Sequence, residues 1–337
     1  MMIKRFTLNL LIILLVAGCT NTGQPDVSGI KVELTTRRFD KDFFSLDTTK
    51  LVAGLNDLRN KYPSFTDLFL NRVLNVDPRW SGDSLTFYVK GFINAYKPVY
   101  DSASKVFSDF SLYERELEKA IRYVKFYFPA YSVPHNIITY IGPMDGLGDI
   151  ISDDAFAVGL QVHLGQNFSL YKSTYVSETY PSYISKRFTP AYISINAMQN
   201  VIDDMFPEKL EDKSLVIQMV EKGKRLYLIS KFLPGKAEYQ LIGYTKSQLE
   251  ESYKNETMIW DLFIKNDLLQ SIDNDIVSHY IGDSPFTGEL GERSPGNIGS
   301  FTGWQIVKKY MTNSKISLKE LMTTDPEALF EKAKYKP

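Results

Sequence analysis

The sequence has very few of the residues that most often carry chemistry. Cys19 is the only cysteine among 337 residues, so no disulfide can form within the chain. The three histidines are His135, His163 and His279, and no two of them have the spacing of metal ligands. We interpret each histidine as a surface residue or as a residue at the edge of the core. We therefore predict no cofactor and no metal site.

Several motifs are missing as well. The chain has neither the Gly-x-Ser-x-Gly motif of serine hydrolases nor a glycine pattern that binds nucleotide phosphates. After residue 18, no apolar run approaches the roughly 18 residues that a membrane helix needs. With 39 basic and 40 acidic residues, the chain has no excess of positive charge, which argues against a nucleic-acid partner. The composition favours a globular body without a recognised catalytic motif.

The N-terminus carries the most specific signal in the sequence. Lys4 and Arg5 precede an apolar stretch from Leu8 to Val16, which is too short to span a bilayer comfortably and is typical of a secretory signal. The residues Val-Ala-Gly-Cys that end at Cys19 match the bacterial lipobox, in which cleavage before the cysteine allows it to carry acyl chains such as palmitate. We predict a signal peptide at 1–18, a lipid attachment site and tether at 19–29, and a single globular domain at 30–337. Such a protein would be lipid-anchored in the cell envelope, facing the periplasm from the inner or the outer membrane.

The rest of the chain is organised around one apolar stretch, residues 215–233, which is followed by Pro234-Gly235. Its apolar residues recur at helical spacing beside a narrow polar stripe, so we predict a mostly buried central helix. β-branched and aromatic residues predict strands at 31–39, 136–141 and 155–162, the last two as neighbours, with a loop between them. Helices are predicted at 50–59, 64–74, 84–97, 100–125, 190–205, 244–253, 255–269, 304–312 and 317–322, and from Asp325-Pro326 onward. The expected fold is α+β, predominantly helical with a small β-sheet.

The order of these elements resembles the layout of zinc peptidases that contain the motif HExxH. In those enzymes two histidines at i and i+4 of one helix bind zinc, and the glutamate beside the first histidine acts as the base. Glu221 would correspond to the base and Glu256 to the third ligand, but Val220 and Lys224 occupy the histidine positions and neither ligates zinc. These four residues would then be vestigial positions in a degenerate zincin-like fold. We favour a plainer interpretation of Glu221, in which it is solvated and pairs with Arg225 one turn later.

Two further segments are candidate binding sites. The acidic segment MDGLGDIISDD contains Asp145, Asp149, Asp153 and Asp154, and closely spaced acids with glycines can bind calcium. The EF-hand pattern is absent, so we interpret the segment as a solvated loop. Seven aromatic residues between 168 and 192 suit a recognition surface and core packing equally well.

The segment at 282–303 contains six glycines, which predicts a long ordered loop, and such loops within compact domains are often functional. We expect it to pack against the central helix through Phe286, Phe301 and Trp304. The charged residues at its tip would then face outward as a candidate partner surface: Glu289, Glu292 and Arg293.

Several longer motifs occur in a characteristic order: RFD at 38–40, FAVGLQVHLG at 156–165, YISKRFTPAY at 183–192, MVEKGKRLY at 219–227, SPFT at 284–287, SPGNIGSFTGWQIVKKYM at 294–311 and YKP at 335–337. Together they resemble the gliding-motility lipoprotein GldB family of the Bacteroidetes over nearly the whole mature chain. One departure is LQVHLG at 160–165, where the family tends to have Leu-Asp-x-Tyr-Leu-Gly. This departure puts any role of the family's aspartate in doubt for this chain.

The resemblance implies a membrane lipoprotein needed for gliding and linked to the type IX secretion system, with no established enzyme activity. We therefore expect a protein without catalysis that supports gliding motility, type IX secretion or both through contacts with other proteins of that machinery. Two alternatives remain open. One is a hydrolase or peptidase-related enzyme with an unrecognised site, which a metal content of one ion per chain would favour. The other is a glycan-binding lipoprotein, suggested by the aromatic residues.

Overall fold

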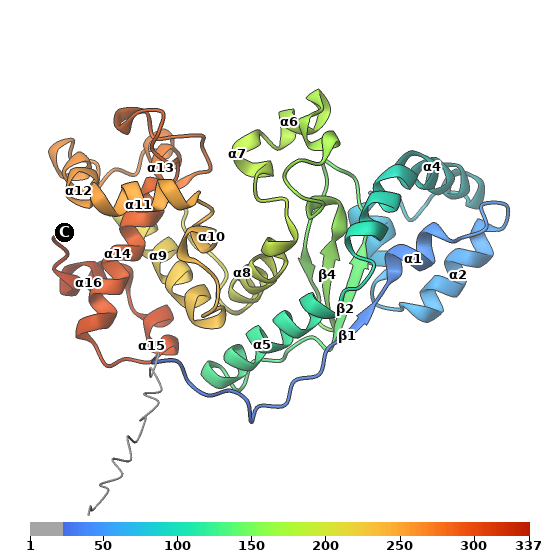
Figure 1. The fold of residues 1–337 in the computed structure, drawn as a ribbon, viewed down its shortest axis with the longest axis horizontal. Helices are drawn as coiled ribbons and strands as arrows, with labels where there is room; N and C mark the ends of the chain where they lie inside the picture. Colours follow the sequence, from blue (N-terminus) through green and yellow to red (C-terminus); the bar gives the residue numbers. More distant parts are fainter. Residues whose placement is uncertain (1–22) are drawn as a thin grey trace, which may run out of the picture.

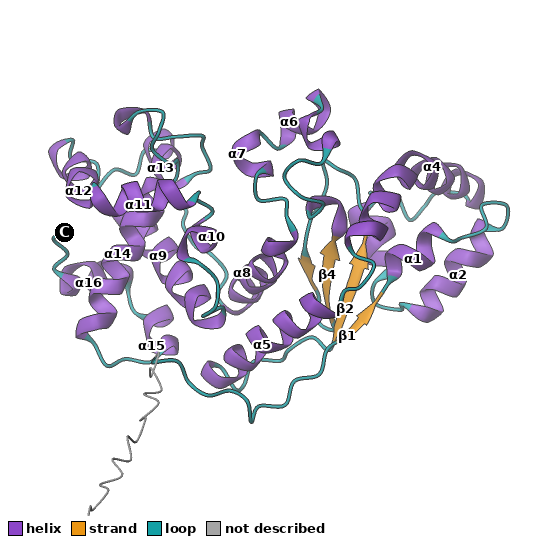
Figure 2. Cartoon of the chain, in the orientation of Figure 1, coloured by secondary structure: helices purple, strands orange, loops and turns teal. Residues whose placement is uncertain are grey.

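The computed structural model describes residues 23–337, so the predicted signal peptide and Cys19 lie outside the described residues. A small sheet lies toward one end of the molecule and a group of helices, α9 to α16, at the other, with α5 and α8 between them (Figure 1). Helices greatly outnumber strands in the described chain (Figure 2). The predicted α+β, predominantly helical fold is therefore confirmed.

The sheet contains four short strands in the order β1-β2-β4-β3. Their bounds are β1 Thr35–Arg37, β2 Asn136–Tyr140, β3 Ile150–Ile151 and β4 Ala155–Gly159. β1, β2 and β4 are parallel, and β3 pairs antiparallel with β4 at the edge. The prediction that the second and third expected strands are neighbours is confirmed by β2 and β4, which are almost entirely buried. β3 is an addition, because it lies within the segment expected to be a loop.

The helices of the first half are α1 Phe39–Phe44, α2 Leu51–Lys61, α3 Thr66–Leu68 with a π-helical continuation at Phe69–Val73, α4 Gly82–Val106 and α5 Ser111–Tyr127. The prediction that a helix ends before Pro98 is wrong, because α4 continues through it. Asn94 and Pro98 are both exposed, so water can satisfy the carbonyl that lacks an N–H partner. The helix predicted at 100–125 is interrupted because Phe107 and Phe110 are buried in the core at the break.

The middle of the chain has three α-helices: α6 Thr174–Thr179, α7 Ser182–Ser185 and α8 Ile193–Met205. The last part contains α9 Leu215–Phe232, α10 Glu238–Ile242, α11 Lys246–Lys254, α12 Glu256–Lys265, α13 Asn274–Ile281, α14 Ile298–Asn313, α15 Leu318–Thr323 and α16 Pro326–Ala333. The predicted central helix is α9, which contacts α14 most extensively and also α8, α10, α13, α15 and α16. Thr245 caps α11 and Asp325 caps α16 through their side chains, close to the predicted starts of both helices.

The glycine-rich segment is shorter as a loop than expected. α14 begins at Ile298, so the last residues of the predicted loop are helical and only 282–297 connect α13 to α14. Gly299 and Gly303 lie inside α14, where the absence of a side chain allows the helix to approach α9 closely. Except for Val162 and Val216, the buried apolar residues of the described chain form one connected cluster from Val27 to Tyr335.

Candidate functional site: a charge-paired cleft

A cleft of about 680 Å³ lies between α8 and α9 and is completed by α10 and by the residues that follow α7 and α13. Its walls combine isoleucine and phenylalanine side chains with amides such as Asn196, Gln199 and Gln240. This size and composition are within the usual range for a small ligand or a short peptide segment. Neither the proposed zincin-like positions nor the charged tip of the glycine-rich segment lines the cleft, whereas Phe188 and Tyr192 of the aromatic segment and Asp149 of the acidic segment do.

Each of the seven charged side chains that line the cleft has an ion-pair partner within residues 23–337. One pair joins the segment after α7 to the segment after α13, three lie on α8, α9 and the loop between these two helices, and one joins the residue before β3 to the residue after the turn that follows β4. The pairs are Arg187–Asp283 at 3.0 Å, Lys222–Glu208 at 2.9 Å, Arg225–Asp203 at 2.5 Å, Arg225–Glu208 at 3.0 Å and His163–Asp149 at 2.8 Å. The cleft therefore offers paired charges and neutral amides to a ligand.

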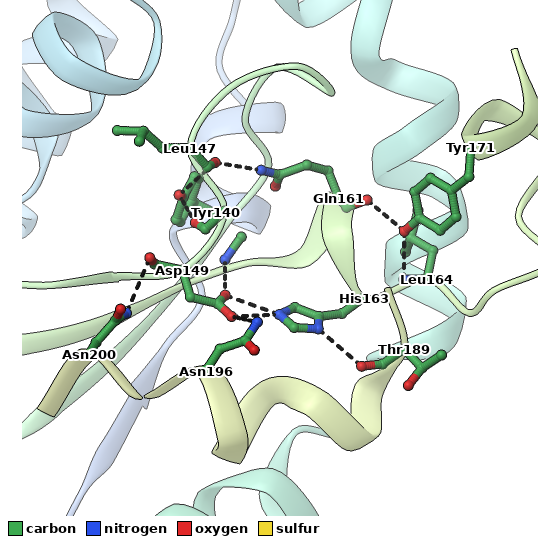
Figure 3. A network of polar contacts seen from close by, with 12 residues as sticks. Tyr140, Leu147, Asp149, Gln161, His163, Leu164, Tyr171, Thr189, Asn196 and Asn200 are labelled. Carbon is green, nitrogen blue, oxygen red and sulfur yellow. Dashed lines mark hydrogen bonds and ion pairs between the residues drawn. The ribbon is translucent and has the colours of Figure 1, made fainter. Parts of the chain in front are cut away.

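The pair at one end of the cleft is almost completely buried. The side chain of His163 is 0% exposed and that of Asp149 is 5% exposed. The ring Nε2 lies 2.8 and 3.0 Å from the two carboxylate oxygens of Asp149, and Nδ1 lies 3.1 Å from the carbonyl oxygen of Thr189 (Figure 3). Each ring nitrogen therefore lies within hydrogen-bond distance of an acceptor oxygen. The carboxylate also accepts N–H bonds from Asn196 at 2.8 Å and from Gly159 at 3.0 Å.

These contacts hold the segment 141–149 against the sheet and against α8. Gln161, which is fully buried, accepts a hydrogen bond from the N–H of Gly142 and donates one to the carbonyl of Leu147, each at 3.0 Å. Burial, and then Asp149, raise the pKa of Tyr140 well above its ordinary value, so its hydroxyl stays protonated and donates to the carbonyl of Leu147 (Figure 3). Gln161 and His163 thus both position this segment.

Sequence reasoning missed the Asp149–His163 pair. It placed Asp149 in a solvated acidic loop and His163 at the surface or at the edge of the core. The signal that could have revealed the pair is the hairpin: β3 pairs with β4 so that Ile150 is opposite Ala157, which brings Asp149 beside the end of β4. His163 follows directly after that end, in a short 3-10 turn.

The proposed zincin-like positions lie away from the cleft. Val220 and Lys224 are 0% exposed, and the Nζ atom of Lys224 donates to Glu221 at 2.8 Å and to the carbonyl of Thr324 at 2.6 Å. The expected Glu221–Arg225 pair is wrong, because Arg225 points to α8 and the loop after it, whereas Glu221 pairs with Lys224. α9 lines the cleft with Lys222, Arg225, Leu226 and Ile229 instead.

Glu256 belongs to a different neighbourhood. Its carboxylate accepts a hydrogen bond of 2.6 Å from the hydroxyl of Tyr335, which ties the C-terminus to α12. The four acids weighed for calcium do not converge either: Asp145 and Asp153 are exposed, Asp149 faces His163, and Asp154 accepts a hydrogen bond from Ser64 at 2.7 Å. Within residues 23–337, no group of three or more His, Cys, Asp or Glu side chains is arranged to hold a metal ion.

One of the three charged residues at the tip of the glycine-rich segment, Glu289, is hydrogen-bonded to α13. Glu289 accepts hydrogen bonds from His279 at 3.0 Å and from Tyr280 at 2.7 Å, which ties the segment to α13. Glu292 and Arg293 are exposed. Phe301 and Trp304 are fully buried, as helical residues of α14. Any partner surface at this tip therefore consists mainly of Glu292 and Arg293.

These features define an α+β protein with a charge-paired cleft. No helix among the described residues is long and apolar enough to cross a membrane. The family model described as gliding motility protein GldB matches residues 20–337, so the chain belongs to the gliding motility protein GldB family. The family resemblance inferred from the sequence motifs is thereby confirmed. Comparison with curated proteins and with solved structures gave no match.

Proposed function

We propose that this chain is a lipid-anchored protein of the cell envelope that supports gliding motility, type IX secretion or both by contacting other proteins of the machinery, without catalysing a reaction. Membership of the gliding motility family supports the role in motility. The lipobox that ends at Cys19 supports the lipid anchor. The observation that carries the absence of catalysis is the pairing of all seven charged side chains that line the cleft.

A general acid or base must reach the substrate with a free proton or a free lone pair. His163 fails this requirement, because its ring is fully buried and both ring nitrogens are already in hydrogen-bond contact with groups of the protein. Val220 and Lys224 cannot bring a metal to the cleft, because they are buried on another side of α9. Amides such as Gln199 and Gln240, set among apolar walls, suit the backbone of a bound peptide segment.

A second candidate is a hydrolase that uses Asp149, because this carboxylate lines the cleft and is held from behind by a histidine. The variant Asp149→Asn separates the two proposals. If the protein is a hydrolase that uses Asp149, cells with the Asp149→Asn variant lose motility even when the variant reaches normal levels in the envelope. For a protein that acts through partners, motility follows the amount of folded protein, because Asp149 serves to position the segment 141–149.

Crosslinking in intact cells, followed by purification from membranes and mass spectrometry, tests the proposal. We expect proteins of the motility or secretion machinery to be captured in stoichiometric amounts. Glu292→Lys combined with Arg293→Glu should reduce the capture, because both residues are exposed at the tip and the double reversal keeps the net charge. Asp57→Lys combined with Lys90→Glu is the matched control, because it reverses two exposed charges on α2 and α4, near the opposite end of the molecule. Equal capture by both double variants would place the partner surface elsewhere.

A further inference from the structure

The first described residues, 23–33, form an extended segment, here called the strap, that runs along the molecule from the group of C-terminal helices to the sheet. It runs beneath α15 and α5 and reaches β1 (Figure 1). The side chain of Gln24 donates to the carbonyl of Pro234, after the end of α9, at 3.4 Å, and Val27 is only 7% exposed. Farther along, the backbone N–H groups of Leu34 and Thr36 donate to two glutamates of α5 at 3.2 and 3.0 Å. The chain is therefore attached to the body almost from its first described residue.

This attachment leaves a short distance between the predicted lipid and the body. Cys19 precedes Gly23 by four residues and the buried Val27 by eight. An extended chain gains at most about 3.5 Å per residue, so these segments reach about 14 Å and about 28 Å. A compact body of this length has a radius of gyration of about 20 Å and is therefore about 50 Å across. Even with only Val27 as the fixed point, the lipid cannot reach the opposite side of the body.

We propose that the face formed by residues 23–33 and by the turn Pro234–Lys236 lies against the surface of the membrane lipids. The opposite side, which carries α7 and α13, then points away from the membrane (Figure 1). The Arg187–Asp283 pair, which follows these two helices, lies on that side of the cleft, and so does the segment 282–297. The inference rests on the lipid anchor of the proposed function and adds a fixed orientation, in which the cleft and the charged tip are presented to partners in the periplasm.

Two glycines provide a matched pair of reporter positions. Gly235 lies in the turn after α9, on the proposed membrane face, and Gly288 lies in the segment after α13, on the opposite side. Both are exposed, neither has a positive φ, and a Cβ at either position would meet nothing within 4 Å. A residue with a clickable side chain can therefore replace either glycine with little disturbance of the fold. Cys19 then remains the only cysteine for the lipid.

The experiment measures quenching of a fluorophore at position 235 or 288 by nitroxide groups on phospholipid heads. The full chain is isolated from membranes with its lipid and reconstituted in phosphatidylcholine vesicles. We expect at least threefold stronger quenching at 235 than at 288. A flexible Gly-Ser insert of 20 residues before Gly23 has a root-mean-square length of about 25 Å and should reduce this difference. Equal quenching at the two positions in the chain without the insert, or stronger quenching at 288, overturns the proposal.

The lipid itself is tested separately, by the mass of the N-terminal peptide of the isolated chain. If that peptide carries no acyl chain, the proposed lipid anchor fails, but the orientation can still be measured. In that case Cys19 is coupled to a maleimide phospholipid, and the same quenching comparison decides whether the strap fixes the body. The two failures are therefore distinguishable.

Discussion

Gly223 of α9 and Gly303 of α14 lie where the two helices cross, and neither position has room for a side chain. A Cβ on Gly303 would lie 1.7 Å from the carbonyl oxygen of Met219, and a Cβ on Gly223 would lie 2.2 Å from the carbonyl oxygen of Gly303. The helices thus meet backbone to backbone, and a contact of this kind cannot be relieved by rotating a side chain. Because α9 forms one wall of the cleft, this crossing also determines where that wall lies.

Gly303→Ala should therefore destabilise the protein by about 3 kcal/mol or more, at the upper end of the usual cost of overpacking, because only a shift of the backbone makes room. Urea unfolding followed by circular dichroism measures the change in the free energy of unfolding. Gly91→Ala is the control, because Gly91 is exposed in α4 with open space around it, and the change should stabilise the helix by about 0.5–1 kcal/mol. Similar small effects for both variants would show that the two helices are not in close contact.

Lys224→Met should lower the free energy of unfolding by about 1–3 kcal/mol, although it keeps the volume and the apolar stem of the side chain. The variant leaves the carbonyl of Thr324 without its buried partner, which costs about the free energy of an unsatisfied polar group. Glu221 is partly exposed and can turn to water, so its lost pairing adds little. The same unfolding measurement tests this expectation, and a gain in stability would contradict it.

Restoring the missing histidines should not create a zinc enzyme. In the double variant Val220→His with Lys224→His, two imidazoles replace fully buried side chains that do not line the cleft. We expect lower stability and no stoichiometric zinc in the folded protein, because buried polar rings without partners are costly. Elemental analysis after gel filtration measures the metal. One zinc per folded chain would contradict this expectation and would support a vestigial metal site at these positions.

The Asp149–His163 pair should be energetically coupled. His163→Gln and Asp149→Asn should each lower the free energy of unfolding by about 2–4 kcal/mol, because each leaves a buried polar group without its hydrogen-bond partner. The double variant should cost about 1–2 kcal/mol less than the sum of the single variants, because the second change no longer breaks an intact pair. Additive losses would mean that the two side chains act independently of one another.

The elements with strong local signals could be predicted from the sequence. Thr245 with Gln248 and Asp325 with Pro326 mark helix starts through capping chemistry, which is local, and the sequence predicts both helices to begin within one residue of these caps. The continuation of α4 through Pro98 could not be predicted, because it depends on the burial of one face of α4 and on the exposure of Asn94 to water. Tertiary packing outweighs a local helix-breaking signal here.

The site was harder to predict than the fold. Gly303 was identified as part of a loop, although its role is to let α14 touch α9, and this role depends on a residue 84 positions earlier, Met219. His163 lacks ligand spacing in the sequence, and its partner Asp149 is found only once β3 and β4 are paired. Such contacts depend on strand register and helix crossing, which spacing along the chain does not contain.

The most direct test of the central claim is the spreading of gliding colonies that carry the double variant Glu292→Lys with Arg293→Glu, at the protein level of the wild type. The claim is that the protein works through partner contacts, and these two residues are exposed charges of the glycine-rich tip. We predict reduced spreading with an unchanged melting temperature, whereas Asp57→Lys with Lys90→Glu spreads normally. Normal spreading of the tip variant, together with loss of spreading in a folded Asp149→Asn variant, would contradict the account and favour catalysis at the cleft.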